Sequence, residues 1–195
     1  MSARFAYRVA VTAFDRDADA RRLDYRLMAN TFVTLFWRPS VFDEAVQWLA
    51  GHGYTVVHLD ARRWATEADM HREVASALDF PDYYGHNLDA LNDCLRDVVA
   101  YRYGTTREAT GLLIAFNGYH AFAEADPRCA AEVLDIIAGQ ARSAALIGHR
   151  MLCLVQSDDP QIAFEPVGAM PVLWNHREWL DARRQPGSDP HPPIA

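Results

Sequence analysis

Residues Phe80–Leu95 read FPDYYGHNLDALNDCL, and this stretch divides into a turn-forming half and a helix-forming half. Pro81 stops a preceding helix because its ring removes a backbone hydrogen-bond donor. Gly85 then relaxes the backbone, and Asn87 is a strong candidate for a helix N-cap. The stretch therefore predicts a break in the chain, followed by a helix from Asn87 to about Val99.

The predicted helix has two different faces. One face carries Asp89, Asp93 and Asp97, because residues four apart lie on the same side of a helix. The other face is apolar and fits packing against a core, which leaves the acidic face for solvent or for a partner. The apolar residues are Leu88, Leu91, Leu95 and Val98, with Cys94 beside them.

The acidic face has two interpretations. The helix dipole favours an acid in the first turn, and an acidic outer face is ordinarily just solvated. Like charges four residues apart, however, cost about a few tenths of a kcal/mol per pair, which favours their presentation to something basic. The adjoining Tyr83 and Tyr84, if exposed, add rigid contact area of the kind enriched at interface hot spots.

Short apolar strands alternate with helices on both sides of this stretch. Thr66 is a good N-cap for a helix before Pro81, and Asp126 caps a further helix that ends near Gly148. Strands this apolar, separated by helices, predict an α/β fold with a parallel sheet covered by helices. The predicted strands are YTVVHL (54–59), GLLIAF (111–116) and MLCLVQ (151–156).

Both ends of the chain extend this alternation. FAYRVAVTAF (5–14) and TFVTLFW (31–37) predict two strands joined by a charged loop, 15–26, and Ser40 caps a helix through Leu49. We interpret this part as an extension of the same sheet, because no linker follows it. Toward the other end, MPVLW predicts a strand and HREWLDARR a short helix.

Composition narrows the class of protein. With 195 residues, of which 50% are hydrophobic and 23% charged, the chain fits one large globular domain with additions. The formal net charge of −7 argues against direct nucleic-acid binding and favours a basic protein partner. The sequence contains no run of about 18 apolar residues, so we expect no membrane crossing. The three scattered cysteines form no CxxC pair, which argues against structural zinc and indicates reduced thiols in the cytoplasm.

The opening stretch resembles the signature of the barstar family, inhibitors of barnase-type ribonucleases, which carry a P-x-Y-[YF]-G-x-N-x-D-A-L-x-D-C-L run. The order of strands and helices around it also fits. The resemblance implies a three-layer α/β fold with a three-stranded parallel core sheet, which we expect N-terminal strands to extend. The predicted organisation is a strand–strand–helix extension (1–53), a barstar-like domain (54–156), a strand/helix extension (157–185) and a disordered tail (186–195).

The resemblance also implies a function. In the family, the signature loop and helix plug the active site of a ribonuclease, and Asp93 corresponds to the acid that occupies the enzyme's phosphate site. We therefore expect an immunity or antitoxin protein that binds a basic ribonuclease or nuclease toxin, with no catalytic residue, cofactor or metal of its own. The expected partner-binding residues are Tyr83, Tyr84, Gly85, His86, Asn87, Leu88, Asp89, Asn92 and Asp93. This hypothesis requires the carboxylates of Asp89 and Asp93 to face solvent and not to be neutralised by arginines of the same chain.

Some residues depart from the family pattern. Asn92 stands where many members have tryptophan, and His86 where the best-known inhibitor has an acid. That inhibitor also uses a glutamate on the next long helix, whereas DIIAGQARSA (135–144) offers none, and the nearest acids are Glu132 and Asp135. Inhibition of barnase itself therefore does not follow, and a different nuclease or toxin is a possible target.

Two other functions compete with inhibition. His86, Asp89 and Asp93 can be imagined as metal ligands of an enzyme, but the other histidines are scattered singly and no ligand spacing recurs. Alternatively, the fold serves as a scaffold or interaction module, with tryptophans of the extensions at an interface. A scaffold would tolerate loss of Asp89 and Asp93, whereas an inhibitor would not. The tryptophans concerned are Trp37, Trp48, Trp174 and Trp179.

Overall fold

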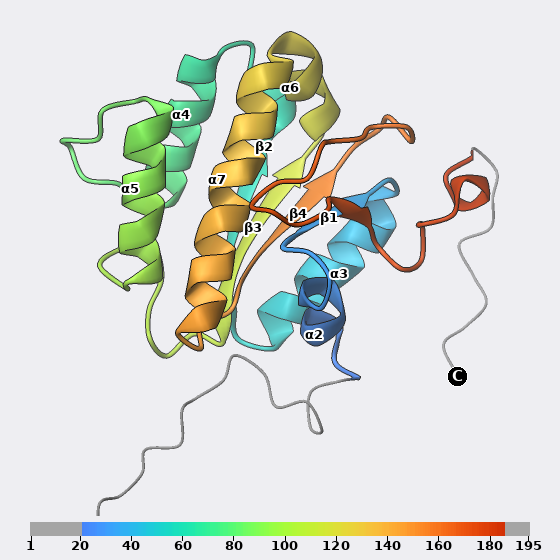
Figure 1. Ribbon diagram of the computed structural model, residues 1–195, viewed down its shortest axis with the longest axis horizontal. Coiled ribbons are helices and arrows are strands. Elements are labelled where there is room, and N and C mark those ends of the chain that lie inside the picture. The colour runs from blue at the N-terminus through green and yellow to red at the C-terminus, as the bar shows by residue number, and fades with distance from the viewer. Residues whose placement is uncertain (1–20, 186–195) are drawn as a thin grey trace, which may run out of the picture.

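The computed structural model describes residues 21–185, and its centre is a five-stranded, wholly parallel sheet (Figure 1). The strands lie side by side in the order β2-β3-β4-β1-β5. β2, β3 and β4 form the predicted three-stranded core, and β1 extends it by pairing with β4, Val33 opposite Cys153. The strands are β1 (Val33–Phe36), β2 (Tyr54–Asp60), β3 (Gly111–Asn117), β4 (Met151–Gln156) and β5 (Leu173–Trp174).

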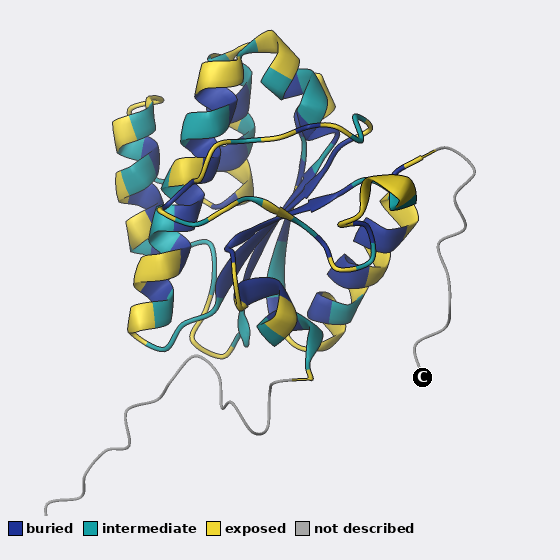
Figure 2. Cartoon of the chain, turned by 45° about the vertical axis from the view of Figure 1, so that its right-hand side comes forward, coloured by how far each residue is buried: buried dark blue, intermediate teal, exposed yellow. Residues whose placement is uncertain are grey.

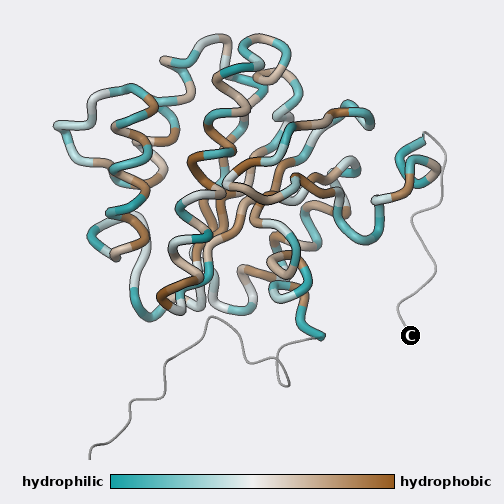
Figure 3. The backbone as a smooth tube through the Cα atoms, in the orientation of Figure 1, coloured by the Kyte–Doolittle hydropathy of each residue, from teal (hydrophilic) through white to brown (hydrophobic). Residues whose placement is uncertain are grey.

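The central strands are almost completely buried. Every residue of β1 and β4 is buried, and the sheet is dark blue in Figure 2 and largely brown in Figure 3. A parallel sheet needs helical crossovers, and these cover both of its faces, so its strands are apolar along their whole length instead of alternating. This is why β3 and β4 could be identified from sequence as apolar runs, whereas β2, at the edge of the sheet, is only partly buried.

Six α-helices and two short 3₁₀ turns are described around the sheet. Thr66 caps α4 as predicted, in a reciprocal capping box with Asp69. Among the described residues, no helix is both long and apolar enough to cross a membrane. The helices are α2 (Leu23–Met28), α3 (Pro39–Gly51), α4 (Glu67–Ala77), α5 (Leu88–Val99), α6 (Tyr119–Ala125) and α7 (Pro127–Leu146), with 3₁₀ turns at Ala61–Arg63 and Asp181–Arg183.

The helices form a layer on each face of the sheet. Crossovers between parallel strands are right-handed, so the direction in which the chain moves along the sheet decides which face the helix covers. The chain moves one way from β1 to β2 and the opposite way from β2 through β3 to β4. α3 therefore lies on one face, and α5 and α7 lie on the other (Figures 1 and 2). The predicted three-layer α/β fold is confirmed.

The N-terminal part differs from its prediction at several points. The strand expected at 5–14 lies outside the described residues, whereas the one expected at 31–37 is β1. The predicted loop 15–26 already contains the start of α2. Ser40 is not the cap of α3, because the helix begins one residue earlier, at Pro39, with Arg38 in the N-cap position and no capping bond from its own side chain. Proline suits this first position because its missing N–H is not needed there.

The C-terminal part contains less regular structure than predicted. The strand at 170–174 is confirmed only as Leu173–Trp174, and the helix expected at 176–184 is wrong, since one 3₁₀ turn replaces it. The physical reason is tertiary. The buried side chains of Asn175 and Glu178 bond to the backbone of residues 35–38 instead of supporting a local helix. The tail predicted at 186–195 lies outside the described residues.

Candidate functional site

The loop before α5 is held by one tyrosine and displays the other. Tyr84 is 6% exposed, and its hydroxyl bonds to Nδ1 of the buried His71 on α4. Nε2 of His71 lies 3.1 Å from Oε1 of Glu67, so in the neutral tautomer that donates from Nε2 to this carboxylate, Nδ1 accepts the hydrogen bond from the Tyr84 hydroxyl. Tyr83 is 78% exposed. The condition of exposure is therefore met by Tyr83 and not by Tyr84, whose ring packs inside the loop.

The two residues that follow shape the entry into the helix. The positive φ, 49°, belongs to His86 and not to Gly85. Gly85 is instead closely packed: a Cβ there would lie 3.1 Å from Nδ2 of Asn87, so the cap side chain would have to shift by a few tenths of an ångström. His86 is exposed. Backbone strain of this kind is common where the surrounding structure holds a functional loop in place.

α5 is fixed at its start and along its inner face. Oδ1 of Asn87 accepts from the backbone N–H of Ala90 at 2.8 Å, which confirms the predicted N-cap. The outer face is consequently held on a helix with little freedom to move. The predicted inner residues Leu91, Cys94, Leu95 and Val98 are buried, and Leu88 is half-buried.

The three aspartates of α5 differ in their surroundings. Asp89 is exposed, and no hydrogen bond or ion pair of its side chain is found among the described residues. Asp93 also faces solvent, with 63% of its side chain exposed, but Oδ1 lies 2.8 Å from Nη2 of Arg96. Asp97 is less exposed and lies 3.3 Å from Arg102. The hypothesis required both carboxylates to face solvent, and those of Asp89 and Asp93 do. It also required that no arginine of the same chain pair with them. Asp89 meets this second requirement, and Asp93 does not.

The ion pair with Arg96 does not prevent Asp93 from contacting a partner. Both side chains are 63% exposed, and exposed pairs three residues apart on a helix contribute only about 0.2–0.5 kcal/mol. A guanidinium supplied by a partner in a dry interface makes stronger charge-assisted bonds than this. Asp93 can therefore exchange Arg96 for a partner at little cost.

A groove of about 580 Å³ runs beside α5, between it and α7. Asp89 and Asn92 line it from α5, and Oδ1 of Asn92 accepts from Nε2 of Gln140 on α7 at 2.7 Å. Asn92 thus links two helices at the place where many members of the resembled family have tryptophan. Glu132 and Asp135, the acids noted on α7, line the same groove.

One residue of this region was not identified from sequence. Glu165, in the segment after β4, joins the lining of the groove. That segment runs across α7 in Figure 1 and is held there by the backbone N–H of Gly168, which donates to Oδ1 of Asp135 at 2.7 Å. No periodic pattern surrounds Glu165, and Glu165 is far from Asp89 along the chain. Nothing in the sequence therefore indicated that the two residues line the same groove.

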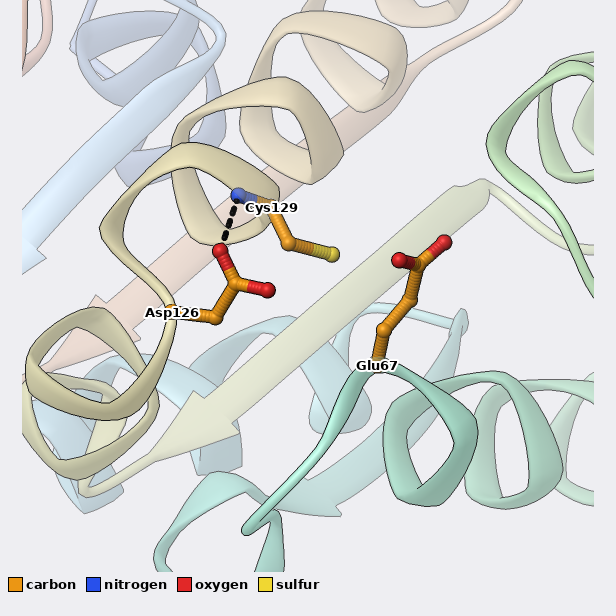
Figure 4. A group of neighbouring side chains, drawn as sticks. All are labelled: Glu67, Asp126 and Cys129. Carbon is orange, nitrogen blue, oxygen red and sulfur yellow. Dashed lines mark hydrogen bonds between the residues drawn. The ribbon is translucent and has the colours of Figure 1, made fainter.

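A second cluster combines Glu67, Asp126 and Cys129 (Figure 4). Their ligand atoms lie within 4.8 Å of one another, which is the kind of grouping that can hold a metal ion. Each acid already has a structural role, however. Glu67 is in the first turn of α4, and Oδ1 of Asp126 caps α7 by accepting from the backbone N–H of Cys129 at 2.9 Å. Burial, with help from both carboxylates, raises the pKa of the Cys129 thiol to about 12.

These surroundings predict unreactive thiols. Cys94, Cys129 and Cys153 are all unpaired, and none is more than 5% exposed. Since the thiolate is the reactive form, we expect no fast-reacting thiol in the native protein at about pH 8 and three after unfolding in guanidinium. Absorbance on reaction with a disulfide reagent measures this directly. A native thiol reacting as fast as free glutathione would contradict the expectation.

Comparison with known proteins identifies the family. A family model described as "Barstar (barnase inhibitor)" matches residues 54–156, which is more than half of the chain and includes the loop, α5 and α7. A Bacillus subtilis (strain 168) protein named "Putative ribonuclease inhibitor YrdF" is 51% identical over 37 residues. That match covers 19% of this chain and 41% of the relative, so the chain spans about two fifths of the relative's length. Because the family model covers more than half of the chain and the structure has the expected α/β framework, the chain belongs to the barstar family.

Proposed function

We propose that this protein is an intracellular inhibitor, of the immunity or antitoxin type, that blocks the active site of a basic ribonuclease or related nuclease toxin. It binds through Tyr83 and the outer face of α5, with Asp93 at the enzyme's phosphate site and Asp89 beside it. Leu88, Asn92 and the loop residues Gly85, His86 and Asn87 form the remainder of the contact surface. Reduced, buried cysteines support a cytoplasmic location.

The observation that carries the proposal is the outward presentation of Asp89 and Asp93 on a capped helix. A ribonuclease cleft gathers arginine, lysine and histidine around a phosphodiester, and a carboxylate can take the place of the phosphate. α5 is capped by Asn87 and preceded by a loop anchored through Tyr84, so little ordering is needed on binding. The net charge of −7 would speed the encounter with a basic enzyme.

Binding rather than catalysis fits the arrangement of this face. His86, Asp89 and Asp93, the residues of the alternative enzyme hypothesis, are all exposed to solvent. A catalytic carboxyl or imidazole is commonly desolvated inside a cleft, whereas these three side chains face water. We propose that the chain has no catalytic residue, cofactor or metal requirement.

Inhibition assays test the proposal. Purified protein is added to barnase and to a panel of other bacterial ribonucleases of the barnase type, and cleavage of a fluorogenic RNA substrate is followed. We expect stoichiometric inhibition of at least one enzyme, with association that slows as salt rises because exposed charges are screened over about 10 Å at 0.1 M. Full activity of every enzyme at micromolar protein would contradict the proposal.

A scaffold function remains the second candidate because the C-terminal segment exposes apolar side chains. Trp179 is 67% exposed, Leu180 50% and Leu173 37%, and exposed apolar patches can mark contact surfaces. This surface belongs to the segment around β5, apart from α5. If partner binding depends on Trp179 and tolerates the loss of Asp89 and Asp93, the scaffold function is supported and inhibition is not.

A further inference from the structure

A second cavity, of about 550 Å³, lies against α3, the helix that covers the opposite face of the sheet from α5 and α7 (Figures 1 and 2). Its walls come from α2, from α3 and from the segment 175–177 that follows β5, and Phe36 of β1 adds to its floor. All of these residues lie outside the part of the chain, 54–156, that the family model matches. The family assignment therefore gives this cavity no role.

The cavity combines positive charge with an apolar floor. Its only acid among the described residues is Glu44, which is paired with Arg177. Arginines outnumber acids in the lining although the chain as a whole has a formal net charge of −7. The arginines are Arg21, Arg22, Arg26 and Arg177. The main apolar residues, all buried or half-buried, are Leu27, Phe36, Val41, Ala45 and Trp48.

The arginines of α2 and its start differ in how far they are already paired. Nη2 of Arg22 lies 2.8 Å from Oδ2 of the fully buried Asp24, so this guanidinium is held in place. Arg21 and Arg26 are exposed, and no ion pair of either side chain is found among the described residues. The charges of Arg21 and Arg26 are therefore available to an anion.

His176, which also lines the cavity, gives independent support for uncompensated positive charge there. Partial burial lowers the pKa of its imidazole, and the charges of Arg26 and Arg177 lower it further. Neighbouring cations disfavour the protonated ring, and no acid of the lining outweighs them. The potential in the cavity is therefore positive, which favours an anionic occupant.

We propose that this cavity binds a small organic anion, a phosphate or carboxylate carried on a flat apolar body. The charged group binds Arg21 and Arg26, and the apolar body packs on the floor of the cavity. A guanidinium suits either group because its planar donors match the oxygens of phosphate and carboxylate alike. The volume lies within the range of about 300–1,000 Å³ of small-molecule sites, whose linings are mostly apolar with a few polar groups. The site does not depend on nuclease inhibition.

Titration of the full chain with the dye anilinonaphthalene sulfonate tests this site without a nuclease. The dye carries an anionic group on flat apolar rings, and its fluorescence rises when those rings leave water. We expect saturable binding, with a dissociation constant that the double variant Arg21→Gln, Arg26→Gln raises about tenfold or more. The matched control Arg107→Gln, Arg142→Gln removes the same charge from exposed positions elsewhere and should change it less than about twofold. Binding that does not saturate, or an equal effect of the two double variants, overturns the inference.

Competition against the bound dye separates the two kinds of anion. Adenosine monophosphate offers a phosphate on a flat body, and naphthoate offers a carboxylate on one. We expect at least one of them to displace the dye from the wild-type chain and to lose this effect in the Arg21→Gln, Arg26→Gln variant. The compound that displaces the dye assigns the charged group. Displacement by neither would make the dye an adventitious additive only and would overturn the inference.

The alternative occupant is the acidic sequence that precedes the cavity. Asp15, Asp17 and Asp19 come shortly before Arg21 in the chain. The triple variant Asp15→Asn, Asp17→Asn, Asp19→Asn distinguishes this possibility, because it removes the carboxylates and keeps the length of the chain. Equal dye binding by the wild type and the triple variant supports a site for a separate anion. If only the triple variant binds the dye, carboxylates of the same chain occupy the cavity and the inference is wrong.

Discussion

Asp93→Ala should weaken the complex with a ribonuclease by more than about 2 kcal/mol, as the loss of a hot-spot acid does. The expected cost exceeds that of an ordinary surface acid because the partner's cations would be left buried and unpaired in the interface. The free protein loses only the exposed pair with Arg96, so its free energy of unfolding should change by less than about 0.5 kcal/mol. Surface plasmon resonance and urea unfolding measure the two quantities separately.

The matched control for this variant is Asp43→Ala. Asp43 is an exposed acid on α3, which covers the opposite face of the sheet, and its removal changes the net charge by the same amount. A general electrostatic attraction would respond equally to both substitutions, whereas a local contact responds only to Asp93. An unchanged dissociation constant for Asp93→Ala, with an inhibited enzyme in hand, would show that Asp93 is not at the phosphate site.

The framework around α5 was predictable because its signals are local. The Asn87 cap, the apolar stripe and the unbroken apolar strands each follow from residues within a few positions of one another. The pairing of Asp93 with Arg96 was also readable, since the two are three residues apart on one helix, and it shows that positive charge is present on this face. Local periodicity was therefore enough for the fold and for the direction of the acids.

What sequence could not supply depends on contacts between distant segments. Tyr83 and Tyr84 are adjacent and alike, and only the position of His71 on another helix decides that Tyr84 turns inward. The place of Glu165 likewise depends on the path of the chain after β4, which carries little regular structure. Such contacts leave no periodic trace, because each involves one side chain and a surface far away along the chain.

The start of α3 also depends on a contact with a distant segment. We expect the loss of this contact to have the largest effect on stability. The N-cap residue Arg38 makes no capping bond with its side chain, and the backbone just before the helix is bound instead by the fully buried Glu178. Oε2 of Glu178 accepts from the backbone N–H of Trp37 and Oε1 from that of Arg38, both at 3.0 Å. Nδ2 of Asn175 also donates to Oε2, so one carboxylate joins the C-terminal segment to the helix. An anion at this position is further favoured by the helix dipole.

Glu178→Ala should therefore lower the free energy of unfolding by about 3 kcal/mol or more, since two partly buried backbone N–H groups and the buried Asn175 amide lose this acceptor, and each such loss costs about 1–3 kcal/mol. Urea unfolding followed by far-UV circular dichroism measures the loss. Glu165→Ala, which removes an exposed glutamate of the same segment, should change stability by less than about 0.5 kcal/mol. A loss below about 1 kcal/mol for Glu178→Ala would mean that water reaches these donors and that the carboxylate does not hold the segment on α3. The full loss would instead show that the C-terminal segment, which carries Glu165 to the groove, is folded as part of the same unit as the sheet.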